Sequence, residues 1–431
     1  MVDALAITPF GGPIDAVVVP PGSKSITNRA LLVAALATGT STLRGVLFAD
    51  DTEAMIDCVR ALGAAVEMGN ESTTLLVTGV GGSFSGSSAT FFARQSGTTA
   101  RFLAPVLALG EVPLTLDADE AMRRRPMVDV FNALQRLGVK VSYQGSEGFL
   151  PAVIEGPVDV VGETPTVTID ASVSSQFTSG LLLAAPCMPA GLRIEISGEV
   201  VSRPYLDMTV AVMASFGSIV DQPDERTLIV APGGYVANDY SIEPDASAAS
   251  YFFAAAAICG GTVRIDGLGS NSMQGDVRFV DVLADMGAIV SIDENSISVT
   301  GAPLHGVISD FSQISDTAQT AAAVAVFAEG PTTITGIGFI RRKETDRIAA
   351  VVSELTRMGI DATEEADGFT VTPGATSPVT VETYDDHRMA MSMALVGFAR
   401  GGILIADPNC VRKTFPTYFD EMERLRPGGT K

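Results

Sequence analysis

The sequence predicts an α/β protein of two domains, each a two-layered inverted α/β barrel with its helices inside and its sheets outside. A pattern of helix, Gly, strand, polar turn and second helix recurs six times, at a spacing of roughly 70 to 80 residues. The first helix of each copy is apolar on every side, which requires burial all round. The strands alternate apolar and polar residues, so each has one packed face and one wet face. Three copies per domain then close each core.

Six glycines set the phase of the repeat: Gly39, Gly110, Gly191, Gly261, Gly330 and Gly402. The predicted inner helices precede them, at Ala30–Ala37, Arg101–Leu109, Thr178–Ala185, Ala248–Cys259, Thr317–Ala328 and Met389–Phe398. Alternating strands follow, most clearly at Leu192–Ile196 and Thr262–Asp266. The sixth copy stops short at the C-terminus.

The predicted domain boundary falls between the third and fourth copies, where the stretch Ala231–Pro244 reads as irregular. A strand-like segment, Ala16–Val19, precedes the first full copy, and we expect it to pair with the C-terminal half. The chain is therefore expected to cross between domains twice. One domain comprises residues 1–22 with 244–431, and the inserted domain comprises residues 23–243.

The composition excludes several classes of function. With 431 residues of which 46% are hydrophobic, the chain can bury large cores. A net charge of −22 disfavours nucleic acid and anionic membranes as partners. The cysteines are widely spaced and read as reduced thiols: Cys58, Cys187, Cys259 and Cys410. Only His305 and His387 are present, which argues against a histidine-based metal site. Without a membrane-length apolar run or a basic signal segment, we expect a cytoplasmic protein.

Basic residues concentrate in two sets of polar turns. One set opens the apolar helices: Gly22–Arg29, Gln95–Arg101, Ser174–Gly180, Asp245–Ser250, Ser315–Thr320 and Asp385–Arg388. The other follows the strands: Asp50–Asp51, Arg123–Arg125, Ser202–Tyr205, Asp276–Arg278, Arg341–Arg347 and Arg412–Lys413. Half of the 28 Lys and Arg residues lie in these turns even when Arg278, whose place is ambiguous, is left out. Since helix N-termini also favour anions, the turns predict an anion site shared by facing domain ends.

Taken singly, these turns have other interpretations. Gly22–Ser25 is similar to a phosphate-binding P-loop, but Ser23 stands where that motif needs its second Gly. Ser174 and Asp316 also suit simple helix caps. The charged runs Lys343–Arg347 and Asp386–Arg388 also suit solvated surface helices.

As an ordered set, the turns resemble the 5-enolpyruvylshikimate-3-phosphate (EPSP) synthase family, the 3-phosphoshikimate 1-carboxyvinyltransferases, over the full length of the chain. The resemblance rests on these segments: Pro21–Arg29, Ser96–Arg101, Arg125–Pro126, Ser174–Gln176, Ser202–Tyr205, Asp245–Ser247, Asp316, Lys343–Arg347, Asp386–Ala390 and Lys413–Pro416. It implies six βαβαββ-like repeats, three per domain. It also implies transfer of the enolpyruvyl group of phosphoenolpyruvate to the 5-hydroxyl of shikimate 3-phosphate, with release of phosphate.

The resemblance further implies a cytoplasmic monomer of the shikimate pathway, which leads to chorismate and the aromatic amino acids. Such an enzyme needs no cofactor and no metal, acts on two small anions, and is a target of the herbicide glyphosate. The implied shikimate 3-phosphate contacts are Lys24, Ser25, Arg29, Ser174, Ser175, Gln176, Ser202, Tyr205, Asp316 and Lys343. The implied phosphoenolpyruvate contacts are Lys24, Gly97, Arg125, Gln176, Arg347, Arg388 and Lys413.

The chemistry requires groups that move protons, and the resemblance gives this role to Asp316, Glu344, Lys24 and His387. Asp316 is the expected base for the 5-hydroxyl, while Glu344 and Lys24 both remain candidates at the methylene carbon. Three positions depart from the family pattern: Gln95, Phe102 and Phe339.

Two rival functions remain open at the level of sequence. The sister UDP-N-acetylglucosamine enolpyruvyl transferase uses a loop cysteine as its acid, and Gly110–Arg125 contains none. A non-catalytic anion-binding repeat protein would need the basic turns but neither Asp316 nor Glu344.

Overall fold

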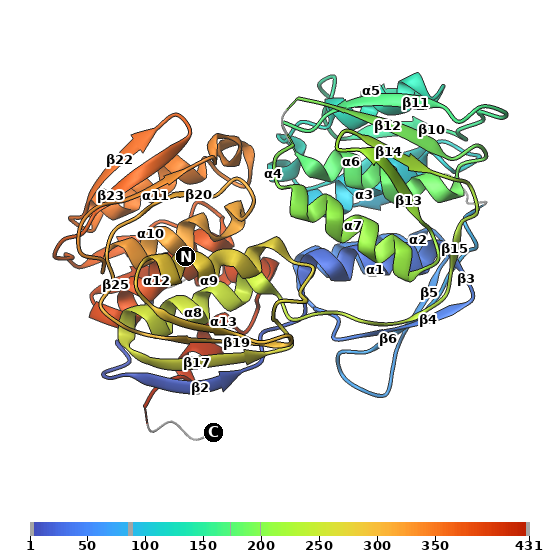
Figure 1. The fold of residues 1–431 in the computed structure, drawn as a ribbon. Helices are drawn as coiled ribbons and strands as arrows, with labels where there is room; N and C mark the ends of the chain where they lie inside the picture. The colour runs from blue at the N-terminus through green and yellow to red at the C-terminus, as the bar shows by residue number, and fades with distance from the viewer. Residues whose placement is uncertain (1–3, 85–88, 173, 199, 428–431) are drawn as a thin grey trace. The chain divides into compact units, whose positions relative to one another are not determined.

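The computed structural model describes residues 4–84, 89–172, 174–198 and 200–427, which form two compact units. One unit comprises residues 1–21 with 244–431, and the other comprises residues 22–243. In Figure 1 the first unit contains the yellow to red elements together with the blue N-terminal strand β2. The second unit contains the remaining blue elements and the green ones.

The unit of residues 22–243 contains three four-stranded sheets within its described residues. The first sheet has the strand order β16 (Asp239–Ser241), β4 (Thr40–Arg44), β6 (Leu75–Thr78) and β5 (Ala65–Met68). The second has the order β7 (Thr90–Phe92), β8 (Leu114–Asp117), β10 (Ala152–Glu155) and β9 (Lys140–Tyr143). The third has the order β11 (Thr166–Asp170), β12 (Leu192–Ser197), β14 (Thr227–Val230) and β13 (Val220–Asp224). In each sheet the first pair is parallel and the other pairs are antiparallel. The sheets are therefore copies of one pattern.

The other unit repeats this pattern. Its sheets are β2 (Ile14–Val18), β17 (Gly261–Asp266), β19 (Ser296–Thr300), β18 (Ile289–Ile292); β20 (Ile308–Asp310), β21 (Thr332–Thr335), β23 (Gly368–Thr372), β22 (Asp361–Glu365); and β24 (Val379–Val381), β25 (Ile403–Ile405), β1 (Leu5–Ala6). The N-terminal strand β2 pairs with β17 in parallel, as the sequence predicted. The short sixth copy is completed by β1, which runs antiparallel to β25.

The inner helices open on the predicted polar turns. They are α1 (Lys24–Leu36), α3 (Gly97–Leu107), α6 (Ser175–Ala184), α8 (Ala246–Cys259), α10 (Ala318–Ala325) and α12 (His387–Arg400). Every residue of α3 and of α10 is buried, and so is α12 up to Phe398. This burial confirms the prediction that the apolar helices form the cores.

The second helices follow the central strand of each copy. They are α2 (Asp50–Ala61), α5 (Val128–Arg136), α7 (Arg203–Ser215), α9 (Phe279–Asp285), α11 (Arg347–Arg357) and α13 (Tyr418–Glu423). Of these, α2, α5, α7, α9 and α11 each contact both an inner helix and a strand. Shorter elements are α4 (Glu120–Arg123), η1 (Ala185–Cys187), η2 (Gly275–Arg278), η3 (Ser315–Thr317), η4 (Gly338–Arg342) and η5 (Pro408–Lys413).

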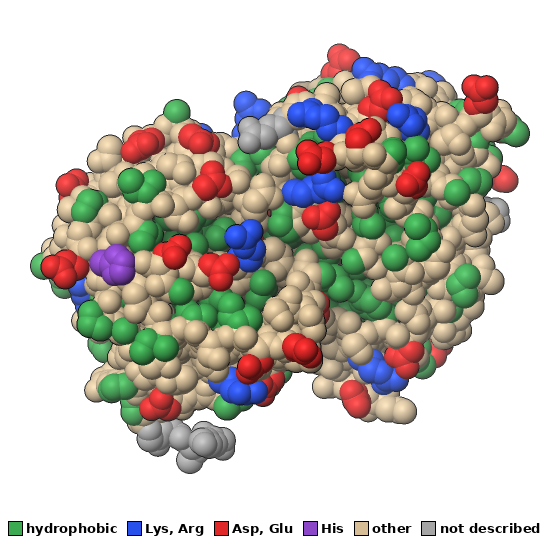
Figure 2. Space-filling model, in the orientation of Figure 1, with side chains coloured by type: hydrophobic (Ala, Val, Ile, Leu, Met, Phe, Trp, Pro, Cys, Tyr) green, Lys and Arg blue, Asp and Glu red, His purple; other side chains and the backbone are tan. Residues whose placement is uncertain are grey.

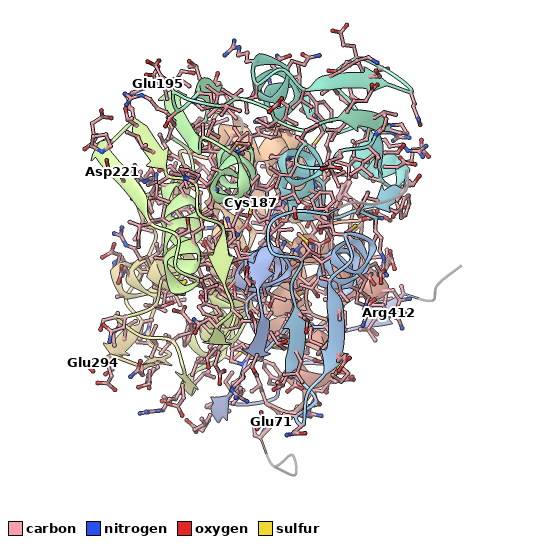
Figure 3. The ribbon with its side chains drawn as sticks, turned by 90° about the vertical axis from the view of Figure 1, so that its right-hand side faces the viewer. Glu71, Cys187, Glu195, Asp221, Glu294 and Arg412 are labelled. Atoms are coloured by element: carbon pink, nitrogen blue, oxygen red, sulfur yellow. The ribbon has the colours of Figure 1, made fainter. Side chains whose placement is uncertain are left out.

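The predicted alternation along the strands is present. In β12 the side chains of Leu192, Ile194 and Ile196 are buried, while Glu195 between them is exposed. Figure 3 shows Glu195 and Asp221 projecting from the outer face of their sheet. On the face drawn in Figure 2, acidic and basic side chains lie next to one another rather than in separate regions.

Two glycines show why the repeat needs this residue at the start of its central strand. Gly191 and Gly261 have φ values of +67° and +85°, a region that favours glycine. A Cβ atom at Gly261 would lie 2.1 Å from the carbonyl oxygen of Ile14, and one at Gly191 would lie 2.1 Å from that of Val230. Any side chain here would separate paired strands.

Two of the predictions about local structure differ most from the observed elements. The stretch Ala231–Pro244 is not irregular, because it contains β15 (Tyr235–Val236) and β16, which pair in parallel with β3 (Ala37–Thr38) and β4. Strands of two or three residues are too short to display an alternating pattern. Helix α10 ends at Ala325 rather than Ala328, because the next backbone N–H groups bond three residues back, as in a tightened final turn. Of the helices in the described residues, none has both the length and the apolar character needed to span a membrane.

Candidate active site

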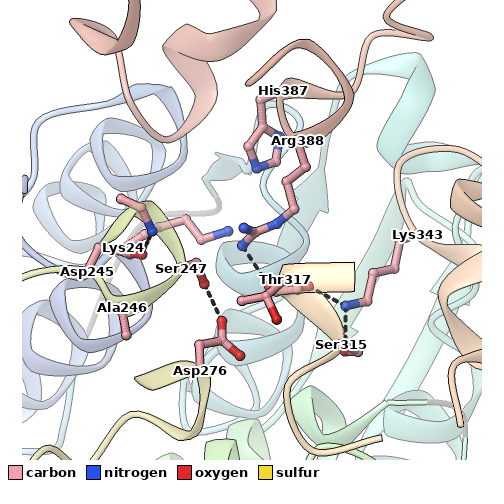
Figure 4. Close-up of polar contacts among 12 residues, drawn as sticks. Lys24, Asp245, Ala246, Ser247, Asp276, Ser315, Thr317, Lys343, His387 and Arg388 are labelled. Atoms are coloured by element: carbon pink, nitrogen blue, oxygen red, sulfur yellow. Dashed lines mark hydrogen bonds and ion pairs between the residues drawn. The ribbon is translucent and has the colours of Figure 1, made fainter. Parts of the chain in front are cut away.

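In the unit of residues 1–21 with 244–431, several predicted site residues lie around Asp316. This carboxylate, in η3, accepts hydrogen bonds from Lys343 (2.5 Å), Arg347 (3.2 Å) and Arg388 (2.8 Å). The three cations belong to different segments: the turn after η4, the start of α11 and the start of α12. Figure 4 shows Arg388 and Lys343 reaching the segment beside Thr317 from different sides. Asp316 is therefore held by charge-assisted hydrogen bonds, which are about twice as strong as neutral ones.

A second carboxylate, Glu344, extends this network. It accepts from Arg347 at 2.8 Å and from Lys413 at 3.0 Å. Arg347 lies between the two carboxylates and also donates to Asp386 at 2.7 Å. Each of the cations Lys343, Arg347, Arg388 and Lys413 thus contacts Asp316 or Glu344.

Helix caps fix the orientation of the network. Asp386 is the N-cap of α12 and accepts from the backbone N–H of Arg388 at 2.9 Å, and it also accepts from the guanidinium of Arg347. The side chain of His387 is 1% exposed, and its Nδ1 lies 3.7 Å from Asp386. One capping carboxylate therefore joins the helix that carries Arg388 to the helix that begins with Arg347.

Burial and charge act in opposite directions on the pKa values of these cations. Burial disfavours the charge of Arg347, but Asp386, Glu344 and Asp316 together raise its pKa above the ordinary value. Burial lowers the pKa of Lys343; Asp316 opposes this change, and Arg347 adds to it. The surroundings therefore disfavour the charge of Lys343 and favour that of Arg347.

Another buried carboxylate lies close to the network around Asp316. Asp276, in η2, is 4% exposed and accepts a hydrogen bond from the hydroxyl of Ser247 (Figure 4). Burial, followed by the charge of Asp316, raises the pKa of Asp276 from 3.8 to about 6. The sequence assigned no role to this residue. Groups of His, Cys, Asp and Glu arranged to hold a metal ion are absent from the described residues.

In the unit of residues 22–243, Lys24 and Arg29 lie on α1 but have different surroundings. Lys24 is the first residue of the helix and forms an ion pair with the buried Asp51 at 3.4 Å. Arg29 is 1% exposed and donates to the backbone oxygens of Ser25 (2.9 Å) and Tyr205 (3.0 Å). Burial lowers the pKa of Arg29 to about 10. The buried Arg29 thus links the backbone of Ser25 to the backbone of Tyr205 through these hydrogen bonds.

The unusual Phe102 contacts this same arginine. Its ring is fully buried, and the guanidinium of Arg29 lies over it, 4.9 Å from the ring centre. This contact links Phe102, and so helix α3, to Arg29 on α1. A second departure, Phe339, has the ammonium of Lys343 at 5.7 Å from its ring.

Helices α3 and α6 hold a further group. Ser174 caps α6 and accepts from the backbone N–H of Gln176 at 3.3 Å, which agrees with its capping interpretation. The Gln176 side chain accepts from Arg101 at 2.7 Å and donates to Thr98 at 3.3 Å. Ser175 is the first residue of α6 and is buried.

Gly97 and Arg125 are also adjacent. A Cβ atom built on Gly97 would lie 3.0 to 3.1 Å from three atoms of the Arg125 guanidinium. Ser202, with a left-handed φ of 57°, precedes α7, and Tyr205 lies in the first turn of that helix.

Several basic residues of the polar turns do not join either group. They pair with nearby acids on the surface: Arg123 with Asp117, Arg124 with Glu120, Arg203 with Asp207, and Arg341 with Asp346 and Glu364. Arg412 is exposed and lies at the edge of the view in Figure 3. The sequence pattern therefore overcounts the cations that could serve the predicted anion site, since these residues pair with acids close in space.

Sequence reasoning missed some residues that position the site: Asp51, Arg101, Asp276 and Asp386. Each lies inside a polar turn that the sequence had marked, but the pairing partner is distant along the chain. Arg347 and Asp386, for example, are 39 residues apart.

Comparison with known proteins agrees with this site. The model of the family EPSP synthase (3-phosphoshikimate 1-carboxyvinyltransferase) matches residues 10–422. The 3-phosphoshikimate 1-carboxyvinyltransferase of Trichormus variabilis is 44% identical over 425 residues, covering 98% of this chain and 99% of that protein. The Aliivibrio salmonicida enzyme of the same name is 40% identical over 428 residues, covering 98% and 99%.

A solved structure shows the same fold. The 2.37 Å structure of EPSP synthase from Acinetobacter baumannii superposes with a TM-score of 0.83 at 25% identity, and 98% of each chain is covered. The family match, the similar enzymes and the shared α/β fold all extend over nearly the whole chain. The chain belongs to the EPSP synthase (3-phosphoshikimate 1-carboxyvinyltransferase) family.

Proposed function

We propose that this protein transfers the enolpyruvyl group of phosphoenolpyruvate to the 5-hydroxyl of shikimate 3-phosphate and releases phosphate. The observation that carries this proposal is the network in which Asp316 and Glu344 are surrounded by four cations. Both substrates are multiply charged anions, so they require several cations close together. The reaction also requires acids and bases beside those cations, and the two carboxylates meet that need.

The proposed binding residues follow the family pattern. Shikimate 3-phosphate is held by Lys24, Ser25, Ser174, Ser175, Gln176, Ser202, Tyr205, Asp316 and Lys343, and Arg29 contributes by fixing Ser25 and Tyr205. Phosphoenolpyruvate is held by Lys24, Gly97, Arg125, Gln176, Arg347, Arg388 and Lys413. The contacts of Gln176 with Arg101 and Thr98 support this assignment, because a fixed amide is a better ligand than a mobile one.

The proposed chemistry is an addition followed by an elimination. Asp316 accepts the proton of the 5-hydroxyl while that oxygen bonds to C2 of phosphoenolpyruvate, and Glu344 or Lys24 protonates the methylene carbon. In the resulting tetrahedral intermediate, the bond from C2 to the phosphate oxygen breaks and phosphate leaves with the electron pair. Loss of a proton from the new methyl group restores the double bond. His387 lies beside Asp386 in this proposal and helps to hold the charged groups near C2.

We also propose that the two units are inverted α/β barrels built from six βαβαββ-like repeats, three in each. The recurring strand pattern and the buried inner helices support this description. The proposal includes action as a cytoplasmic monomer in the shikimate pathway, without a cofactor, and competition by glyphosate.

The cysteines favour this function over the sister UDP-N-acetylglucosamine enolpyruvyl transferase. That enzyme uses a loop cysteine as its acid. Here burial raises the pKa of each cysteine to about 12: Cys58, Cys187, Cys259 and Cys410. A thiol with such a pKa is a poor proton donor at neutral pH.

A phosphate-release assay tests the proposal. Phosphate should appear only when phosphoenolpyruvate and shikimate 3-phosphate are both present. Release with phosphoenolpyruvate and UDP-N-acetylglucosamine instead would assign the sister activity. Tight binding of both anions without turnover would leave a non-catalytic anion-binding protein.

A further inference from the structure

The turn before α12 holds two consecutive residues in a costly backbone conformation. Tyr384 and Asp385 have φ values of 56° and 55°, in the left-handed region that residues with a Cβ atom rarely adopt. The next residue, Asp386, caps α12 and binds Arg347. The path of this turn therefore decides where Asp386 and Arg388 lie.

A buried carboxylate on α11 fixes the turn. The hydroxyl of Tyr384 donates to Glu354 at 2.7 Å, and Glu354 is fully buried. The same carboxylate accepts from the backbone N–H of Glu382 at 3.1 Å and from Arg357 at 2.6 Å. Glu354 thus holds the turn on both sides of Thr383, and α11 packs against α12 (Figure 1).

The other unit contains an equivalent arrangement. Arg94 has a φ of 49° and lies two residues before the N-cap Ser96 of α3, as Tyr384 lies two before Asp386. It donates to Asp57 at 2.7 Å and to Glu53 at 3.0 Å on α2, which packs against α3. Asp57 is the eighth residue of α2, and Glu354 is the eighth residue of α11. The same contact recurs with different side chains, arginine in one unit and tyrosine in the other.

We propose that Tyr384–Glu354 and Arg94–Asp57 are positioning pairs for enolpyruvyl transfer. Each pair holds a left-handed residue in place, so that the following helix presents its first turn correctly. Those first turns carry Arg388 and Gly97, two contacts of phosphoenolpyruvate in the proposed function, on which this inference rests. Losing a pair should therefore affect phosphoenolpyruvate more than shikimate 3-phosphate.

The test compares alanine with glycine at the left-handed position. Tyr384→Ala removes the hydrogen bond to Glu354 but keeps the free-energy cost of the left-handed backbone, whereas Tyr384→Gly removes both the hydrogen bond and this cost. The KM for phosphoenolpyruvate should be about 5- to 30-fold higher in the alanine variant than in the glycine variant. The KM for shikimate 3-phosphate should be similar in the two. The KM for phosphoenolpyruvate should likewise be higher in Arg94→Ala than in Arg94→Gly.

A matched control is Ser353→Ala, which removes an exposed hydroxyl 3.4 Å from that of Tyr384 without touching Glu354. This variant should keep the parent KM values. Glycine variants that perform no better than alanine variants, or equal changes in both KM values, would overturn the proposal. An alanine variant that fails to fold while the glycine variant folds would support it.

Hydrogen exchange separates this inference from the proposed function. If the parent protein releases no phosphate, the proposed function fails, and amide exchange over residues 384–390 still decides the inference. Exchange there should be faster in Tyr384→Ala than in Tyr384→Gly. Equal exchange rates in the two variants would refute the positioning role.

Discussion

A methyl group at Gly97 is expected to displace Arg125 and weaken binding at the proposed phosphoenolpyruvate site. The added Cβ atom would lie 3.0 Å from Nη1 and 3.1 Å from both Cζ and Nη2 of Arg125. Non-bonded heavy atoms are most stable at about 3.5 to 4.0 Å, so the guanidinium must move by about 0.5 Å. Gly97 opens the fully buried helix α3, so the backbone itself has little room to yield.

This displacement sets the expected size of the effect. A misplacement of about 1 Å costs about 10²-fold in rate, so half that distance should cost about tenfold in kcat/KM for phosphoenolpyruvate. Glyphosate is longer than phosphoenolpyruvate between its acidic groups, so at the proposed site it is expected to fill more of the space near Gly97. Its inhibition constant should therefore rise by more than tenfold in Gly97→Ala. The KM for shikimate 3-phosphate should not change.

The assay is phosphate release over a range of phosphoenolpyruvate and glyphosate concentrations. Gly145→Ala is the matched control, because its Cβ atom would meet its nearest neighbour in the same unit at an ordinary 3.9 Å. Equal glyphosate sensitivity in the parent and Gly97→Ala would refute the reasoning. It would show that Gly97 and Arg125 do not line the phosphoenolpyruvate site.

Three further predictions follow from the same geometry. Asp316→Ala should bind both substrates but reduce kcat by about 10²–10⁴-fold, as expected for loss of a general base; near-normal turnover would remove Asp316 from the mechanism. Because burial raises the pKa of Asp276 from 3.8 to about 6, the stability that its protonation gives is present below pH 3.8 and is lost as the pH rises through 6. The Asp276→Asn variant keeps an acceptor for Ser247 and has no carboxylate to titrate. Its free energy of unfolding, measured with denaturant, should therefore rise by about 3 kcal/mol relative to that of the parent between about pH 4 and pH 7. A difference in the free energy of unfolding that does not depend on pH would contradict this. Saturating shikimate 3-phosphate should lower the radius of gyration measured by X-ray scattering, since its proposed contacts come from both units, and an unchanged profile would count against binding by both.

The cores could be predicted from the sequence because their signal is local. Helices such as α8 (Ala246–Cys259) consist almost wholly of Ala, Phe and other apolar residues, and such a helix has to be buried. In strands such as β12, the alternation of apolar and polar residues in the sequence shows which face is buried and which is exposed. By contrast, β15 and β16 are too short to carry a pattern and form only because β3 and β4 offer unpaired edges.

The site was predictable in its residue types but not in its pairings. Polar turns marked Lys343, Arg347 and Arg388 as a cluster of cations, but only the folded chain shows that all three meet Asp316. The same turns marked Arg29, whose surroundings are instead a buried ring and backbone oxygens. Burial of an arginine depends on distant segments, so no local pattern reports it.

The pairing of β1 and β2 with strands near the other end of the chain has a consequence for synthesis on the ribosome. The sheets of residues 22–243 need no strand beyond β16, so this unit can fold while the rest of the chain is still being translated. Strand β2 has to wait for β17, and β1 has to wait for β25, and both of these partners are made after residues 22–243. During synthesis a folded unit therefore follows a segment whose strands are still unpaired, and such open strand edges are where unwanted pairing with other chains can begin.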